Sequence, residues 1–321
     1  MPREHILQGL EPDNLLAFLA LVGFHRALDH AEPGWHSRVY WGGVPLRPRL
    51  VVSKDLTRAE ILDAAARGCN ALAEVHSFGE HKNLNFDIAE ARRQLEEACK
   101  GDPGSGRLRM DLLSALMSDV ASKDGKIRAT PFCVMFGQGR QYFLERLESV
   151  PKGLPPRELA NEVTADDLNS PARLEQALFH RWVRQDRTQS FRWDPLEDRR
   201  YALRFEDPSD DKGLTVHGAN RLASLALPLL TAVPRRERGE VRLFALTTSW
   251  DSGSVIVSWP VWSRPASLKA VVKMLAGCGI SKPCGGLGVI AIYRSERISV
   301  GKYINFTRAV PVEVDNPLNA S

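Results

Sequence analysis

The sequence predicts an α+β fold: a helix-rich N-terminal part with a small hairpin, followed by a C-terminal part that mixes a small sheet with packed helices. Two patterns carry this prediction. Long segments with apolar residues at helical spacing dominate residues 10–121, whereas residues 241–293 contain shorter apolar runs of strand length around one helix. The chain has 321 residues, of which 43% are hydrophobic, so it can bury a sizeable core.

The first predicted helix begins at Leu15. Either Asp13 or Asn14 can accept the free N–H groups of its first turn. Apolar residues occupy nearly every face of this helix as far as Phe24. We therefore expect it to be buried on several sides.

A hairpin is expected over residues 38–53, as two short strands joined through Gly42 and Gly43. Proline cannot donate a hydrogen bond to a neighbouring strand. Pro45 and Pro48 should therefore keep the second strand at the edge of its sheet.

Three helices should follow this hairpin before residue 122. Thr57 is placed to cap the first, with Glu60 at the capping-box position. The glycine-rich segment 101–106 is expected to be a flexible loop between the other two. The predicted helical ranges are about 57–75, 86–100 and 108–121.

The proline-rich segment 151–156 is the clearest boundary signal. It separates a helix-rich domain (1–150) from the rest of the chain. The rest is predicted to comprise a mainly helical middle segment (151–234) and a basic α+β region (235–321). The other expected elements are strands at 127–136, 241–248, 254–259 and 287–293, and helices at 142–147, 172–187, 222–230 and 268–276. Pro234 is expected to end the helix before it.

The composition is that of a folded globular protein. The longest apolar run, residues 15–24, is well short of the roughly 18 to 20 residues that span a bilayer, so no membrane contact is expected. The N-terminus lacks the pattern of a signal peptide, which predicts a cytoplasmic protein. Five widely spaced cysteines without a Cys-x-x-Cys pair indicate reduced thiols, and no cofactor is expected.

Positive charge is concentrated near the C-terminus. From residue 255 to residue 308, eight Lys or Arg accompany one acidic residue, Glu296. Cations neutralise phosphates, aromatic rings stack on unpaired bases, and an amide can pair with a base edge. The residues expected to contact nucleic acid are Arg294, Arg297, Lys302, Tyr303, Asn305, Phe306 and Arg308. The alternative is a strand with a solvated, charged outer face.

Two other segments are candidate contacts. The glycines at 137 and 139 precede a predicted helix and can allow close approach of a phosphate backbone, with Gln138, Arg140 and Gln141 supplying contacts. The alternative there is a tight strand-to-helix turn. The second segment follows a predicted helix end and contains His81, Lys82, Asn83 and Asn85, which would touch a phosphate or base.

A metal site is the competing interpretation of the second segment. His76 and His81 are separated by four residues, which misses the i, i+4 spacing that places two imidazoles on one helix face. A polar loop is therefore favoured, and no metal is expected. The enzyme alternative is a metal-dependent nuclease that uses these two histidines.

Three separated motifs carry a resemblance to a known family. They are Leu7-x-Gly9-Leu10-x-Pro12-Asp13-Asn14-x-Leu16-Ala17-Phe18-Leu19-Ala20-x-x-Gly23-x-x-Arg26-Ala27-Leu28; Thr130-Pro131 with Phe136-Gly137-Gln138-Gly139-x-Gln141-x-Phe143-Leu144; and Arg297-Ile298-x-Val300-Gly301-Lys302-Tyr303-x-Asn305-Phe306. Together they resemble proteins of type I CRISPR systems, in particular the large-subunit-like proteins of the type I-U (I-G) group.

The resemblance implies a non-catalytic subunit of Cascade, the RNA-guided antiviral surveillance complex. Such a subunit contacts guide RNA, target double-stranded DNA including the protospacer-adjacent motif, or both. It sits among other Cascade subunits and recruits a separate helicase-nuclease. The chain is shorter than many large subunits, and no motif-reading loop can be matched to a position here. A structural assembly subunit without direct nucleic-acid contact is a further alternative.

Overall fold

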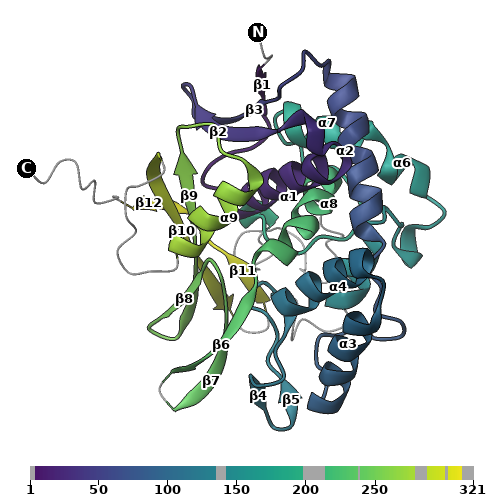
Figure 1. The fold of residues 1–321 in the computed structure, drawn as a ribbon, viewed down its shortest axis with the longest axis vertical. Helices are drawn as coiled ribbons and strands as arrows, with labels where there is room; N and C mark the ends of the chain where they lie inside the picture. Colours follow the sequence, from purple (N-terminus) through teal and green to yellow (C-terminus); the bar gives the residue numbers. More distant parts are fainter. Residues whose placement is uncertain are drawn as a thin grey trace, which may run out of the picture.

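The computed structural model describes residues 4–134, 142–197, 214–237, 239–278, 288–300 and 303–312. It confirms the predicted α+β class, with the helices packed beside a twisted sheet (Figure 1). The helices are α1 (Leu15–Ala31), α2 (Arg58–Ala73), α3 (Ile88–Lys100), α4 (Pro103–Leu116), α5 (Phe143–Ser149), α6 (Ala165–Asn169), α7 (Pro171–Phe179), α8 (His217–Ala226) and α9 (Leu268–Cys278). None of these helices is long and apolar enough to cross a membrane.

The strands form four small sheets within the described ranges. They are β1 (Glu4–Ile6), β2 (Arg38–Gly42), β3 (Arg47–Val51), β4 (Ser122–Lys123), β5 (Lys126–Ile127), β6 (Ala232–Glu237), β7 (Glu240–Ala245), β8 (Thr248–Asp251), β9 (Ser254–Trp262), β10 (Val289–Val300), β11 (Tyr303–Phe306) and β12 (Val310–Val312). Their orders are β1-β3-β2, β4-β5, β6-β7 and β11-β10-β9-β8, with β12 also paired to β10.

Helix starts follow local capping chemistry. Asn14 caps α1, its side-chain oxygen accepting from Ala17 N at 3.3 Å, and Thr57 and Glu60 form the predicted capping box of α2. The predicted loop at 101–106 is wrong, because α4 already begins at Pro103. The Asp102 carboxylate accepts from the first free N–H groups of that helix and so starts it early.

The N-terminal sheet corrects the expected edge position of the second hairpin strand. β3 lies between β1 and β2. Pro48 is tolerated there because its carbonyl accepts from Leu7 N at 2.9 Å, just past the end of β1. The N and O of one strand residue point the same way, so the missing N–H of Pro48 faces a position where β1 has already ended.

The C-terminal strands are longer than predicted. β10 continues through Arg294 and Arg297, so these residues lie inside a paired strand rather than after it. The predicted strand at 241–248 is two strands, β7 and β8, and residues 232–237 form β6 although Pro234 was expected only to end a helix. Pro234 is accepted because β6 pairs with β7 alone.

Other predicted bounds are also corrected. A strand was expected at 127–136. Between residues 127 and 134, only Ile127 lies in a strand, and residues 135 and 136 lie outside the described ranges. The helix expected at 172–187 ends at Phe179. The helix expected at 222–230 already begins at His217, and after Ala226 it continues as a 3₁₀ turn over Leu227–Leu229.

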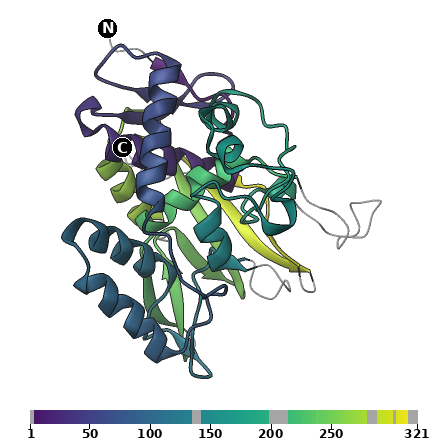
Figure 2. The ribbon, with the colours of Figure 1, turned by 90° about the vertical axis from the view of Figure 1, so that its right-hand side faces the viewer.

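Helix α1 lies at the centre of the helical layer, between α2 and α8 (Figures 1 and 2). Residues 15–28 are all buried, which confirms the expectation for this helix. Two glycines permit the close packing: a Cβ at Gly23 would lie 1.8 Å from Leu222 O, and a Cβ at Gly68 would lie 2.1 Å from Ala27 O. One buried core extends from Leu7 to Ala309. The boundary expected at 151–156 stays a prediction about folding units.

We expect Gly23→Ala to destabilise the protein by about 1–3 kcal/mol, because the new methyl group overlaps the backbone of α8. This loss should exceed the gain of about 1 kcal/mol in helix propensity. Urea unfolding followed by circular dichroism measures the difference. The control is Gly34→Ala, where nothing lies within 4 Å of the added Cβ. Equal free energies of unfolding for the two variants would contradict the α1–α8 contact.

Candidate anion-binding site

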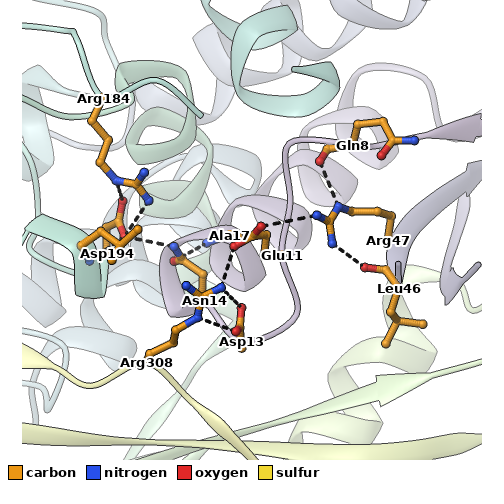
Figure 3. Close-up of polar contacts among 11 residues, drawn as sticks. Gln8, Glu11, Asp13, Asn14, Ala17, Leu46, Arg47, Arg184, Asp194 and Arg308 are labelled. Carbon is orange, nitrogen blue, oxygen red and sulfur yellow. Dashed lines mark hydrogen bonds and ion pairs between the residues drawn. The ribbon is translucent and has the colours of Figure 1, made fainter. Parts of the chain in front are cut away.

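A polar pocket of about 470 Å³ is lined by four arginines. Arg47 is the first residue of β3, Arg181 and Arg184 follow the end of α7, and Arg308 lies between β11 and β12. The loop before α1 supplies Glu11 and Asn14 to the same wall (Figure 3). The pocket thus joins segments that are far apart in the sequence. We call it the arginine pocket.

Two of the arginines pair with carboxylates of the loop before α1. Arg308 Nε lies 2.5 Å from Asp13 Oδ2, and its Nη2 lies 3.0 Å from Glu11 Oε2. The hydrogen bond that Arg308 donates to Asp13 raises the pKa of Arg308, so this side chain stays charged. Arg47 reaches the other oxygen of Glu11 at 3.4 Å and also donates to Gln8 O at 3.1 Å (Figure 3).

Arg184 is held by a buried carboxylate. Its Nε and Nη2 donate to the two oxygens of Asp194 at 2.7 and 3.2 Å, and the Asp194 side chain is fully buried. Asp194 also accepts from Asn14 Nδ2 at 3.0 Å and from Leu196 N at 3.0 Å. Because its two oxygens accept these four hydrogen bonds, Asp194 fixes both Arg184 and the residue that caps α1.

Arg181 completes the set and is the least constrained. It is exposed and makes no ion pair or hydrogen bond with the rest of the described chain. Four guanidinium groups therefore meet three carboxylates, and the site keeps a positive charge. Half-exposed ion pairs such as that of Arg308 contribute only about 0–1 kcal/mol. An incoming phosphate can replace the carboxylates, because the guanidinium fork matches its oxygens.

The C-terminal residues that were expected to bind nucleic acid, and whose side chains the structure describes, are not brought together. Arg308 lines the arginine pocket, whereas Arg297 donates to Pro131 O at 3.2 Å and is mostly buried. Arg294 is half-buried in β10. The expectation that Asn305 and Phe306 contact a base is corrected, because both side chains are buried, with 7% and 1% exposure.

Several of the expected contacts lie outside what the structure describes. Gln138, Arg140, Gln141 and Lys302 are outside the described residues, and so is the side chain of Tyr303. Only the backbone of Tyr303 is placed, in β11 opposite Val300. The expectations for these five positions stay predictions.

The segment after α2 is exposed but already engaged in local contacts. His81 Nε2 lies 3.0 Å from Glu90 Oε1, and the Lys82 ammonium lies 3.6 Å from Glu145 Oε2 and 5.0 Å from the centre of the Tyr142 ring. Asn83 is half-buried and Asn85 is exposed. Contact with a phosphate or base at these positions stays a prediction.

His76 and His81 occupy different environments. His76 is fully buried, with Nδ1 2.9 Å from Leu147 O, whereas His81 lines a separate cavity of about 740 Å³. Across the described ranges, no group of three or more His, Cys, Asp or Glu is placed to hold a metal. The pairing on which the nuclease alternative depends is not assembled in these ranges.

Sequence reasoning missed Arg47, Arg181 and Arg184. Each lies in a segment with no local signal for binding, and only folding places them beside Arg308. A scan against protein-family models and a search of curated proteins return no match to this chain.

Buried histidines should make the fold sensitive to acid. Burial lowers the pKa of His76 and of His217 to about 3 in each case, against about 6.5 in an unfolded chain. Below about pH 6.5 the unfolded chain binds protons that the folded chain does not. We expect each histidine to lower the free energy of unfolding by up to about 1.4 kcal/mol per pH unit between about pH 6.5 and pH 3.

Urea unfolding of wild type and His76→Gln over this pH range measures the effect. The variant should be less stable at neutral pH but should lose less stability on acidification. His180→Gln is the control, because this side chain is 60% exposed. An unchanged pH dependence in His76→Gln would contradict a neutral, buried His76.

Proposed function

We propose that this protein is a non-catalytic nucleic-acid-binding subunit and that the arginine pocket contacts the sugar–phosphate backbone. The observation that carries the proposal is the convergence of Arg47, Arg181, Arg184 and Arg308 from separate segments, with Arg181 left without a partner in the described chain. Phosphate is the anion whose geometry and charge best match several guanidinium groups. The basic C-terminal third adds a longer-range attraction for a polyanion.

The family resemblance narrows the proposal to the Cascade complex of a type I CRISPR system. In that setting the guide RNA reads sequence by base pairing, and the protein contacts the backbone and the short protospacer-adjacent motif of the target DNA. The proposed partners are guide RNA, target double-stranded DNA, other Cascade subunits and a helicase-nuclease recruited after target binding. The proposed compartment is the cytoplasm.

The test measures binding of a fluorescently labelled single strand of RNA or DNA across a salt series. We expect Arg181→Ala combined with Arg308→Ala to weaken binding. The slope of log K against log salt should become shallower by about 1.4, since each lost phosphate contact removes about 0.7 from the slope for a single strand. Thermal unfolding checks that the variant is folded.

The matched control is Arg67→Ala, which removes a 58% exposed arginine of α2 that is paired with Glu32 outside the pocket. Its salt slope should match that of wild type. Absence of binding by wild type to RNA, DNA and a guide–target duplex would overturn the proposed function. Binding that is unaffected by the double variant would remove the arginine pocket from it.

A further inference from the structure

The β6–β7 hairpin has one buried face and one outer face. Alternation along the strands places Ala232 and Leu243 on the inner face, where they pack with Ala121. The opposite face carries residues 233, 235 and 237 of β6 and residues 240, 242 and 244 of β7. Figure 1 shows this hairpin beside the β4–β5 hairpin at the lower end of the molecule.

Two arginines face each other directly on the outer face. Arg235 and Arg242 are cross-strand partners in the β6–β7 register. Like charges in this position oppose strand pairing. Each guanidinium instead lies against an aromatic ring, Arg235 at 5.4 Å from the centre of the Phe244 ring and Arg242 at 4.4 Å from the centre of the Trp250 ring.

Two further arginines extend this pair along the surface. Arg297 of β10 lies 5.8 Å from the centre of the same Trp250 ring, and Arg128, just after β5, lies 3.0 Å from the Glu240 carboxylate. Arg242 reaches the same oxygen of Glu240 only at 3.8 Å, beyond hydrogen-bond distance. Arg128 and Arg242 thus lie near one shared carboxylate, that of Glu240. We call Arg128, Arg235, Arg242 and Arg297, with Phe244 and Trp250, the arginine row.

Three N–H donors of the arginine row have no acceptor. The Nε atoms of Arg128 and Arg242 and the Nε1 atom of Trp250 are shielded from solvent and make no hydrogen bond. Glu237 Oε2 is an unpaired acceptor nearer the hairpin turn, where Glu237 faces Glu240. Because these three nitrogens are shielded, a ligand would meet the outer parts of the same guanidinium groups: the Arg128 side chain is 27% exposed and that of Arg242 is 23% exposed. A ligand that brings negatively charged oxygens complements such groups.

We propose that the arginine row binds the sugar–phosphate backbone of a nucleic-acid strand, as a second contact surface besides the arginine pocket. The proposal rests on the proposed function, because it assigns another surface to the same class of ligand. The row crosses from β6 through β7 and β8 to β10, so it suits an extended ligand rather than a single small anion. A nucleic-acid strand carries one charge per about 3.4 Å of duplex axis, which allows several arginines to be neutralised together.

The test compares Arg235→Ala combined with Arg242→Ala against Arg236→Ala. Arg236 is exposed on the same strand but belongs to the opposite face of the hairpin, so it is a matched control. In the full-length protein we expect the double variant to bind a labelled single strand about tenfold more weakly or worse at about 0.1 M salt, with a salt slope shallower by about 1.4. Arg236→Ala should change affinity less than about twofold. Removing two opposed charges should leave the melting temperature unchanged or raise it.

A second measurement locates the contact. Photocrosslinking to thiouridine-labelled RNA, followed by peptide mapping, should place crosslinks in residues 242–250 of wild type, and the double variant should lose them. Arg297→Ala should also lose these crosslinks, although it leaves the sequence of β6 and β7 unchanged. Loss of the crosslinks in both variants would therefore support the row even if the double variant altered the hairpin locally.

The outcomes separate this inference from the proposed function. If wild type binds nucleic acid and only the arginine-pocket variant weakens binding, the row is overturned and the proposed function stands. If wild type binds neither RNA nor DNA, both are overturned. If the row variant keeps full nucleic-acid affinity but loses binding to a polyglutamate peptide, the row takes an acidic protein segment and the inference is wrong.

Discussion

The close contact between α1 and α8 is the constraint on which the rest of the structure depends. Gly23 lets the two backbones approach, and the buried Arg26 side chain donates to Leu225 O at 2.7 Å across the same contact. Helix α8 in turn carries Arg221, which is fully buried. Its guanidinium donates to Pro151 O, Asn169 O and Asn70 Oδ1, so a single side chain ties the middle segment and α2 to the central helix pair. Each of these oxygens compensates part of the cost of burying the charge.

The same helix also positions the arginine pocket. Asn14 caps α1 through its oxygen and donates to the buried Asp194 through its nitrogen, so the start of the helix and the carboxylate that holds Arg184 form one unit. The preceding loop presents Glu11 and Asp13 to the other side of the pocket. A change in the packing of α1 would therefore move both walls. The site is joined to the rigid core rather than carried on an independent surface loop.

The two arginine-rich surfaces hold their cations by different means. In the arginine pocket, Arg47, Arg184 and Arg308 are paired with carboxylates, and a phosphate must compete with those partners. In the arginine row, aromatic rings and the shared Glu240 hold the guanidinium groups, and the side chains of Arg128 and Arg242 stay partly exposed. Ion pairs between exposed groups weaken with salt, because exposed charges are screened. The two proposed surfaces would thus differ: in the arginine pocket a phosphate replaces carboxylate partners of the arginines, whereas in the arginine row the aromatic rings already hold the arginines in place.

The sequence by itself determined what depends on a few neighbouring residues: the α+β class, a cap for α1 from Asp13 or Asn14, the Thr57–Glu60 capping box and the burial of α1. It also named Arg308, but as a nucleic-acid contact and not as part of a pocket. Only the tertiary structure decided the central place of β3, the burial of Asn305 and Phe306, and the assembly of both arginine surfaces. Capping and amphipathic spacing act within one or two turns, so they can be recognised locally. Contacts between distant segments decide which way a strand residue points and which residues surround an arginine. Arg47, Arg184 and Arg308 lie far apart in the sequence, and nothing in their local sequence indicates that they are close in space.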